Sequence, residues 1–237
     1  MSETRHFKAP FLAAGQAQKH VTVNEALARI DALAAPKALS RMRSDPPPAP
    51  QDGDLYIVGA AASGAWNGAE GAFALYDNGG WRLVAPSAGT EAWVLDEGVR
   101  LAHDGAGWTE AQGAWALGAG CRFGVSVADH LVAAGAASTT APLIPAKSVV
   151  FGVTARVLAP LSGAGLTSWR LGVPDGPGRY GAGYGIELNA YADGLTSGPL
   201  TYYEATPLML EAEGGDFASG TIRLAVHHLV LVPPRAV

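Results

Sequence analysis

Two pairs of carboxylates stand two positions apart, a spacing that places both side chains on the same face of a β-strand. Asp52 precedes Asp54, and Glu211 precedes Glu213. Such pairs can act as acid and base in glycoside hydrolysis or as ligands for Ca²⁺. Neither pair lies in a complete calcium-binding loop, and solvated surface pairs of this kind are common. We therefore expect no catalytic residue and no metal site at either pair.

Histidine and cysteine give no stronger signal for a metal. His227 and His228 are adjacent, and adjacent residues of a strand point to opposite faces, so the two rings cannot easily share one ion. One of them is expected in the core or in an interface. Cys121 is the single cysteine, which excludes an intrachain disulfide and a cysteine-rich zinc site.

Motifs for cofactor binding and nucleophilic catalysis are absent or incomplete. Gly176, Gly178 and Gly181 fit the letters G-x-G-x-x-G, but Pro177 interrupts them and no strand-to-helix context follows. This glycine-rich stretch is better interpreted as a loop or a hairpin tip. No G-x-S-x-G elbow occurs. We expect a protein that is not an enzyme and needs no cofactor.

The aromatic residues suggest binding rather than catalysis, because flat Trp and Tyr rings stack on sugars while polar neighbours bond the hydroxyls. A cluster of this composition lies in the last third of the chain, where core packing is the alternative role for each aromatic ring. The predicted carbohydrate-binding residues are Arg179, Tyr180, Tyr184, Asn189, Tyr191 and Asp193. Packing is the main role expected for Trp66, Trp81, Trp93, Trp108 and Trp169.

The charge distribution separates the start of the chain from the rest. The net charge of −5 argues against a nucleic-acid partner, which would require clustered Lys and Arg. Residues 1–43 nevertheless hold seven Lys and Arg against three Asp and Glu. This segment is either an ordinary solvated one or an anchor for an acidic partner. Neither a signal peptide nor a membrane span is evident, so we expect no membrane association.

A helix is predicted in the first forty residues, with Thr22 and Glu25 as a capping box. Leu27, Ile30 and Ala34 recur at helical spacing and form a narrow apolar stripe, flanked on one side by Val23 and Leu33. Pro36 should stop the helix, and the prolines of residues 46–50 should form a stiff linker. We expect a helical anchor and linker over residues 1–45.

The remainder is predicted to be mainly β. Residues 46–118 contain two units with a strand, an Asn-Gly or Asp-Gly turn and a Trp, which indicate a β-hairpin domain. Residues 119–142 are interpreted as a connector, and residues 143–237 as an antiparallel β-sandwich or jelly roll. Its expected strands are 149–157, 169–173, 184–188, 200–203, 208–212 and 221–232, the last of them in mid-sheet or at a subunit interface.

One segment carries a family resemblance. The run PFLAAGQAQKHVTVNEAL at residues 10–27 closely resembles the opening of a family of otherwise uncharacterised proteins in alphaproteobacterial prophages and gene transfer agents. The similarity continues through DGDLYIVG at 52–59 and AWVLDEG at 92–98, with Gly-Ala-Trp and Gly-Gly-Trp between them, and covers roughly the first half. GPLTYYEATP at 198–207 and the last strand match less closely.

The resemblance implies a head-spike or fibre subunit, assembled in the cytoplasm and then carried on the surface of a released particle. Its implied partners are capsid proteins, further copies of itself and host capsular polysaccharide. Three copies would be typical of a fibre and five of a capsid vertex. The predicted docking and oligomerisation residues are Phe11, Leu12, Gln16, Lys19, His20, Val23, Leu27 and Ile30. The alternatives are a capsule depolymerase and a spike base with no ligand of its own.

Overall fold

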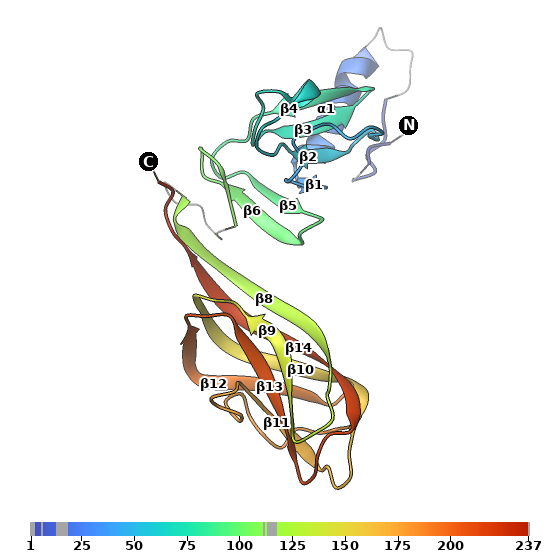
Figure 1. The fold of residues 1–237 in the computed structure, drawn as a ribbon. Helices are drawn as coiled ribbons and strands as arrows, with labels where there is room; N and C mark the ends of the chain where they lie inside the picture. Colours follow the sequence, from blue (N-terminus) through green and yellow to red (C-terminus); the bar gives the residue numbers. More distant parts are fainter. Residues whose placement is uncertain (1–2, 6, 13–18, 111, 113–117, 237) are drawn as a thin grey trace. The chain divides into compact units, whose positions relative to one another are not determined.

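The chain forms two compact units (Figure 1). The computed structural model describes residues 3–5, 7–12, 19–110, 112 and 118–236. The first unit comprises Met1–Gly120 and Val232–Val237, and the second comprises Cys121–Leu231. Strands dominate both units, which confirms the prediction of a mainly β protein with a short N-terminal helix.

The first unit combines one α-helix with two small sheets. One sheet has the order β1-β5-β6-β7 and the other the order β2-β3-β4. The elements are α1 (Lys19–Leu33), β1 (Lys37–Ala38), β2 (Leu55–Ile57), the 3₁₀ turn η1 (Gly64–Trp66), β3 (Phe73–Asp77), β4 (Gly80–Val84), β5 (Glu91–Val94), β6 (Val99–His103) and β7 (Trp108–Thr109).

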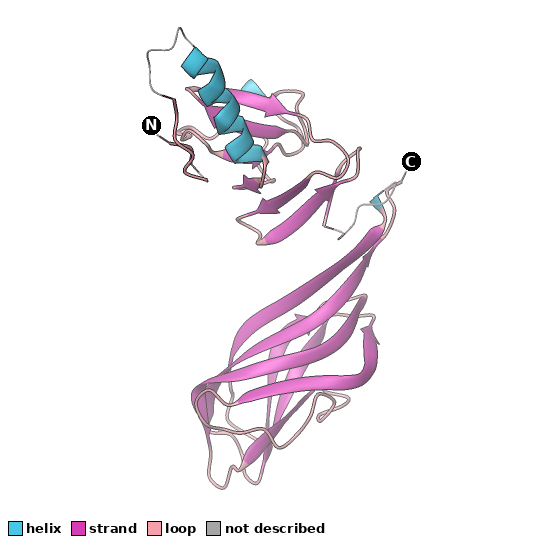
Figure 2. Ribbon diagram, turned by 180° about the vertical axis from the view of Figure 1, so that it is seen from behind, coloured by secondary structure: helices cyan, strands magenta, loops and turns pink. Residues whose placement is uncertain are grey.

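Helix α1 begins before the predicted start. Thr22 lies inside the helix, so it does not cap the N-terminus and the predicted capping box is wrong. The end agrees with the sequence: the last turn closes with the Ala34 N–H donating to the Ile30 carbonyl, and Pro36 follows two residues later. Figure 2 shows α1 lying against the strands of its unit.

The hairpin predictions are confirmed. Strands β3 and β4 pair from Phe73 with Val84 to Asp77 with Gly80, and the turn residues Asn78 and Gly79 both have positive φ angles, 52° and 78°. That backbone is the tight primed turn that an Asn-Gly pair favours. In the second predicted hairpin, which also lies in the first unit, His103 of β6 pairs with Trp108 of β7.

The stiff linker predicted at residues 46–50 is not where the chain divides. Ala38 of β1 pairs with Val94 of β5 and is fully buried. Farther on, the Ser63 N–H donates to the Ser44 carbonyl, so the proline-rich stretch is held against the first unit. The residues before and after the expected linker belong to one unit because a single hydrophobic core contains side chains from both sides of it.

The second unit is built from seven longer strands in two sheets. One sheet has the order β12-β10-β14-β8 and the other the order β11-β13-β9. The strands are β8 (Gly120–Leu131), β9 (Ala137–Ile144), β10 (Ser148–Ser162), β11 (Ser168–Gly172), β12 (Tyr191–Tyr202), β13 (Thr206–Glu213) and β14 (Ser219–Val232).

Every consecutive pair of these strands changes sheet, which is the connectivity of a jelly roll. The predicted strand 184–188 is replaced by a loop that bonds to β11: Tyr184 exchanges two backbone hydrogen bonds with Trp169. Strand β14 lies between β10 and β8, so its predicted central position is confirmed. The prediction of a sandwich or jelly roll is also confirmed.

The predicted connector at residues 119–142 is wrong, because it contains β8 and most of β9. The many small Ala, Gly, Ser and Thr residues masked the period of two in β8, where Phe123, Val125 and Val127 alternate with small residues. Between the two sheets lies a core whose largest fully buried side chains are Trp169, Tyr180, Phe217 and Ile222. Alternate residues of β10 supply Val153, Ala155 and Val157 to it.

Candidate binding surfaces

Helix α1 turns its apolar stripe away from its own unit. Val23 is 40% exposed and Ile30 is 60% exposed, while Leu27 between them is half-buried. The inward side of the helix is small or polar, and there Asp31 and Ala32 are buried. A stripe that a helix does not bury in its own unit is available for another surface.

Hydrogen bonds hold the helix in this orientation. The buried Asp31 carboxylate accepts from the Thr4 hydroxyl at 2.7 Å and from the Phe7 N–H at 2.6 Å. Asn24 exchanges two hydrogen bonds with the backbone of Leu12. Glu25 forms an ion pair with Arg82 of β4 at 3.2 Å. These polar contacts fix the inner side, so the outer side keeps its apolar residues.

The other predicted docking residues have mixed positions. Leu12 is 41% exposed, and its backbone bonds to Asn24. Phe11 is half-buried and lines a cavity of about 300 Å³ between the N-terminal segment, α1 and β3. Gln16 lies outside the described residues, and the side chains of Lys19 and His20 also lie outside them.

Three of the six predicted carbohydrate-binding residues, Arg179, Tyr180 and Tyr184, make structural contacts within the jelly roll. Tyr180 is fully buried, and its hydroxyl lies 2.7 Å from that of Tyr202. Burial and this hydrogen bond raise the pKa of Tyr180. The ring centre of Tyr184 lies 5.1 Å from that of Trp169, and the Tyr184 hydroxyl donates to the Tyr180 carbonyl. Arg179 donates to the Tyr202 hydroxyl at 3.4 Å. For Tyr180 the prediction of a sugar contact is wrong, because no ring face is exposed.

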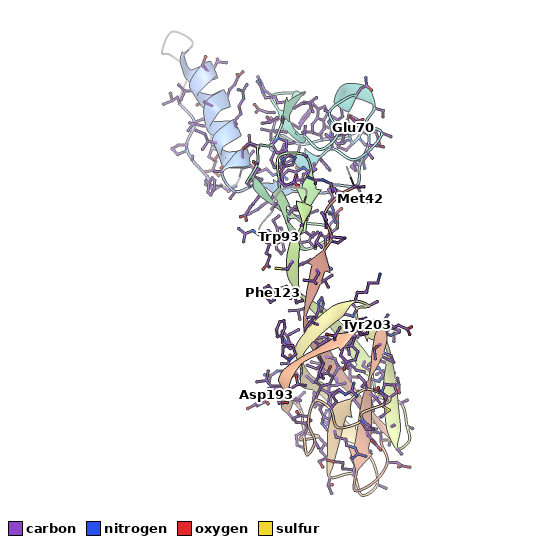
Figure 3. The ribbon with its side chains drawn as sticks, turned by 90° about the vertical axis from the view of Figure 1, so that its left-hand side faces the viewer. Met42, Glu70, Trp93, Phe123, Asp193 and Tyr203 are labelled. Atoms are coloured by element: carbon purple, nitrogen blue, oxygen red, sulfur yellow. The ribbon has the colours of Figure 1, made fainter. Side chains whose placement is uncertain are left out.

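The other three residues are exposed. Tyr191 is 62% exposed, and Asp193 follows on the same face of β12. Asn189 sits just before this strand with a positive φ of 68°, and its carbonyl accepts from Arg156 at 3.0 Å. In Figure 3, Asp193 projects outward from the sandwich.

Around Tyr191 and Asp193 the outer side of the four-stranded sheet forms an open groove of about 450 Å³. Register places Arg156 of β10 opposite Tyr191 and Thr154 opposite Asp193. The Arg156 guanidinium carbon lies 5.8 Å from the centre of the Tyr191 ring, within cation–π distance. Arg223 of β14 closes the groove on its other side.

Charge in the groove is mixed. Arg223 forms a two-bond contact with Asp129 of β8, at 2.6 and 2.7 Å, which lowers the pKa of Asp129. Thr154 meets the His227 ring nitrogen at 3.0 Å. The groove therefore offers an aromatic face together with guanidinium donors, carboxylate acceptors and a hydroxyl. Sugar rings use these groups for stacking and hydrogen bonding.

Sequence reasoning missed Thr154, Arg156 and Arg223 as groove residues. They lie 32 to 37 residues from Tyr191 in the sequence and meet it only through strand pairing. The available signal was alternation: in β10, polar Thr154 and Arg156 alternate with apolar Val153, Ala155 and Val157. A polar position within such a strand faces outward.

The tryptophans are mostly buried or half-buried, as predicted. Trp66 and Trp169 are fully buried. Trp93 departs from the prediction, since it is 44% exposed on β5, where Lys37 and Arg100 are its neighbours on the adjacent strands. An exposed ring between two cations is a second aromatic surface of the chain, in the first unit.

Three of the four carboxylates in the predicted pairs are engaged in structural contacts. Asp54 is buried and accepts from Arg5 at 2.6 Å and from the Gln51 N–H. Glu211 pairs with Arg170 at 2.7 Å, and Glu213 accepts from the Ser168 hydroxyl. Among the described residues, no group of three or more His, Cys, Asp and Glu could hold a metal ion.

The two adjacent histidines point to opposite sides of β14, as predicted. His227 faces the outer side near Thr154, whereas His228 is 5% exposed on the inner side. The Ser126 hydroxyl lies 3.0 Å from His228 Nε2. Burial, Arg122 and His227 lower the pKa of His228. Within the described parts of the chain, no helix is both long and apolar enough to cross a membrane.

Residues 23–109 match the model of a family described as "Protein of unknown function (DUF2793)". The matched part runs from α1 to β7 and lies within the first unit. A comparison with curated proteins finds no match.

Two solved structures resemble part of the chain. A chain of the cyanophage Pam1 capsid asymmetric unit is 18% identical, with a TM-score of 0.36, over 46% of this chain and 86% of its own length. A chain of the acid-stable capsid of Helicobacter pylori bacteriophage KHP30 is 12% identical, with a TM-score of 0.31, over 47% and 93%. Likenesses this distant identify neither a ligand nor a partner.

Proposed function

We propose that this chain is a structural subunit of a phage-like particle, a spike or fibre that attaches the particle to a surface polysaccharide. The N-terminal resemblance supports the particle role. The observation that carries the binding role is the open groove in which Tyr191 lies beside Arg156 and Asp193.

In this proposal the first unit docks the chain to the particle and the second unit binds the polysaccharide. The outward stripe of Val23, Leu27 and Ile30 docks the chain to capsid proteins, and its apolar character suits a protein partner. In the jelly roll, the groove binds the sugar polymer. Its open shape suits a long polysaccharide, because a polymer must lie across a surface rather than enter an enclosed cavity.

A depolymerase is the alternative of a different class. Hydrolysis would require one carboxyl group as an acid and a second as a nucleophile or base on either side of the bond. Asp193 and Asp129 are the carboxylates at or beside the groove, and Asp129 is held by Arg223. The contacts therefore favour binding without cleavage.

The proposal is tested with the full chain and purified surface polysaccharide. Tyr191→Ala removes the exposed ring over Arg156, and it should weaken binding about tenfold, equivalent to about 1.4 kcal/mol. Tyr203→Ala is the matched control, because Tyr203 is 79% exposed on the same unit but lies outside the groove. Equal affinities of the wild type and Tyr191→Ala, or an equal loss in both variants, would contradict the proposal.

A further inference from the structure

Strand β8 points its large apolar residues toward solvent and its small residues toward the core. Its outward positions Phe123, Val125 and Val127 are apolar and 54%, 53% and 56% exposed. The inward positions between them are Gly124 and Ser126, which are small. A solvated strand of a two-layer protein normally points its larger apolar residues into the core.

His228 explains the small inward residues. A methyl group at Gly124 would lie 2.7 Å from the His228 ring, and the Ser126 hydroxyl bonds to the same ring at 3.0 Å. The inward space under β8 is thus filled from β14. This contact gives no reason for the outward Phe and Val residues, which need another explanation.

The apolar surface continues onto two more strands. Phe151 of β10 lies with its ring centre 5.9 Å from that of Phe123. Leu195 of β12 is 79% exposed and lies over Gly152, which has no side chain to displace it. We call Phe123, Val125, Val127, Phe151 and Leu195 the apolar face. Figure 3 shows that Phe123 projects from the same side of the sandwich as Asp193.

Charged groups on this side of the sheet gather toward the opposite end of β12 and β10. Along β12 the outward residues run from Tyr191 and Asp193 in the groove to Leu195 in the apolar face. The Arg223–Asp129 pair also lies at the groove end. Apart from Leu131 of β8, which is 75% exposed beyond Asp129, this side of the sheet is therefore divided into a polar half and an apolar half.

The apolar face is large for a surface left in water. With roughly 150–200 Å² for each free side chain, the exposed fractions sum to on the order of 500 Å². Monomers rarely expose larger apolar patches than this. A standard interface buries about 800 Å² per partner, so the apolar face would supply roughly 500 Å² of it, and a polar rim would supply the remainder.

We propose that the apolar face is where a second copy of this chain packs. Two sheet faces of this kind stack about 10 Å apart, and an apolar centre with a polar rim is the composition of homo-oligomer interfaces. A polysaccharide would find almost no hydrogen-bonding side chain there, whereas the groove half offers several. The inference rests on exposure and packing, and it does not depend on the proposed function.

The test measures the mass of the full chain by sedimentation over a concentration series. The wild type should associate, and Val125→Glu should raise the dissociation constant at least about tenfold, because it places a charge in the apolar face. Leu188→Glu is the matched control: Leu188 is 55% exposed on the same unit but lies outside the apolar face, so association should persist.

Two further variants separate association from folding and from the helix. Val125→Thr and Val127→Thr keep side-chain shape and β-propensity, so a weakened association with an unchanged melting temperature supports the proposal. Ile30→Asp changes only the stripe of α1. A wild type that stays monomeric at all concentrations would overturn the proposal. So would association lost with Ile30→Asp and retained with Val125→Glu. Polysaccharide binding is measured in a separate assay, so a failure of the self-association proposal can be distinguished from a failure of the proposed function.

Discussion

Replacing Tyr180 by Phe tests whether this residue is part of the jelly-roll structure. The substitution removes one oxygen atom that is fully buried and lies 2.7 Å from the Tyr202 hydroxyl. Loss of one such hydrogen bond costs about 1 kcal/mol, and a partner left partly unsatisfied adds to this. Arg179 still donates to Tyr202, so the total loss should be about 1–2 kcal/mol.

Urea unfolding of the full chain, followed by a probe of the second unit, measures this loss. With a slope of about 1–2 kcal/mol per molar urea, the midpoint should fall by about 1 M. The control Tyr191→Phe removes an exposed hydroxyl and should change stability by less than about 0.5 kcal/mol. An unchanged midpoint for Tyr180→Phe, or weaker polysaccharide binding without loss of stability, would refute the structural role of Tyr180.

Two other predictions concern the helix and two histidines of the second unit, the buried His228 and the half-buried His130. Ile30→Asp should lower incorporation of the chain into particles at least about tenfold, without unfolding it, because Ile30 is 60% exposed in the outward stripe. The control Thr22→Asp, on the same helix, should be incorporated normally. Normal incorporation of Ile30→Asp would count against docking through α1. Burial lowers the pKa of His130 and is the main cause of the lowered pKa of His228, so the neutral rings favour the folded state. Stability should therefore be fully present above about pH 6.5, the ordinary value, and should fall as the pH drops from there through the folded pKa values. Denaturant titrations of the wild type and His228→Gln at several pH values measure this; an equal pH dependence in both would remove His228 as a cause.

The sequence allowed prediction of the features that depend on local chemistry. Asn78 and Gly79 favour one type of tight turn, and the hairpin formed there. The succession of six short expected strands within residues 143–237 likewise predicted a sandwich or jelly roll. By contrast, β8 was not predicted, because its large apolar residues face outward while its inward residues Gly124 and Ser126 are small and are covered by a ring from β14.

The candidate site was less predictable for a different reason. Tyr180 and Tyr191 have the same side chain and stand eleven positions apart, yet one is fully buried and the other is 62% exposed. Their difference depends on which loop covers which sheet, which is long-range information. The apolar stripe of α1 was predictable from its spacing, but its outward direction depends on the buried contact of Asp31 with Thr4.

The most direct test of the central claim is incubation of the full chain with purified surface polysaccharide, followed by measurement of both bound polymer and polymer length. A non-enzymatic attachment subunit should retain the polysaccharide and leave its length unchanged. Absence of binding would contradict the attachment role, and progressive shortening of the polymer would show that the chain is a depolymerase instead.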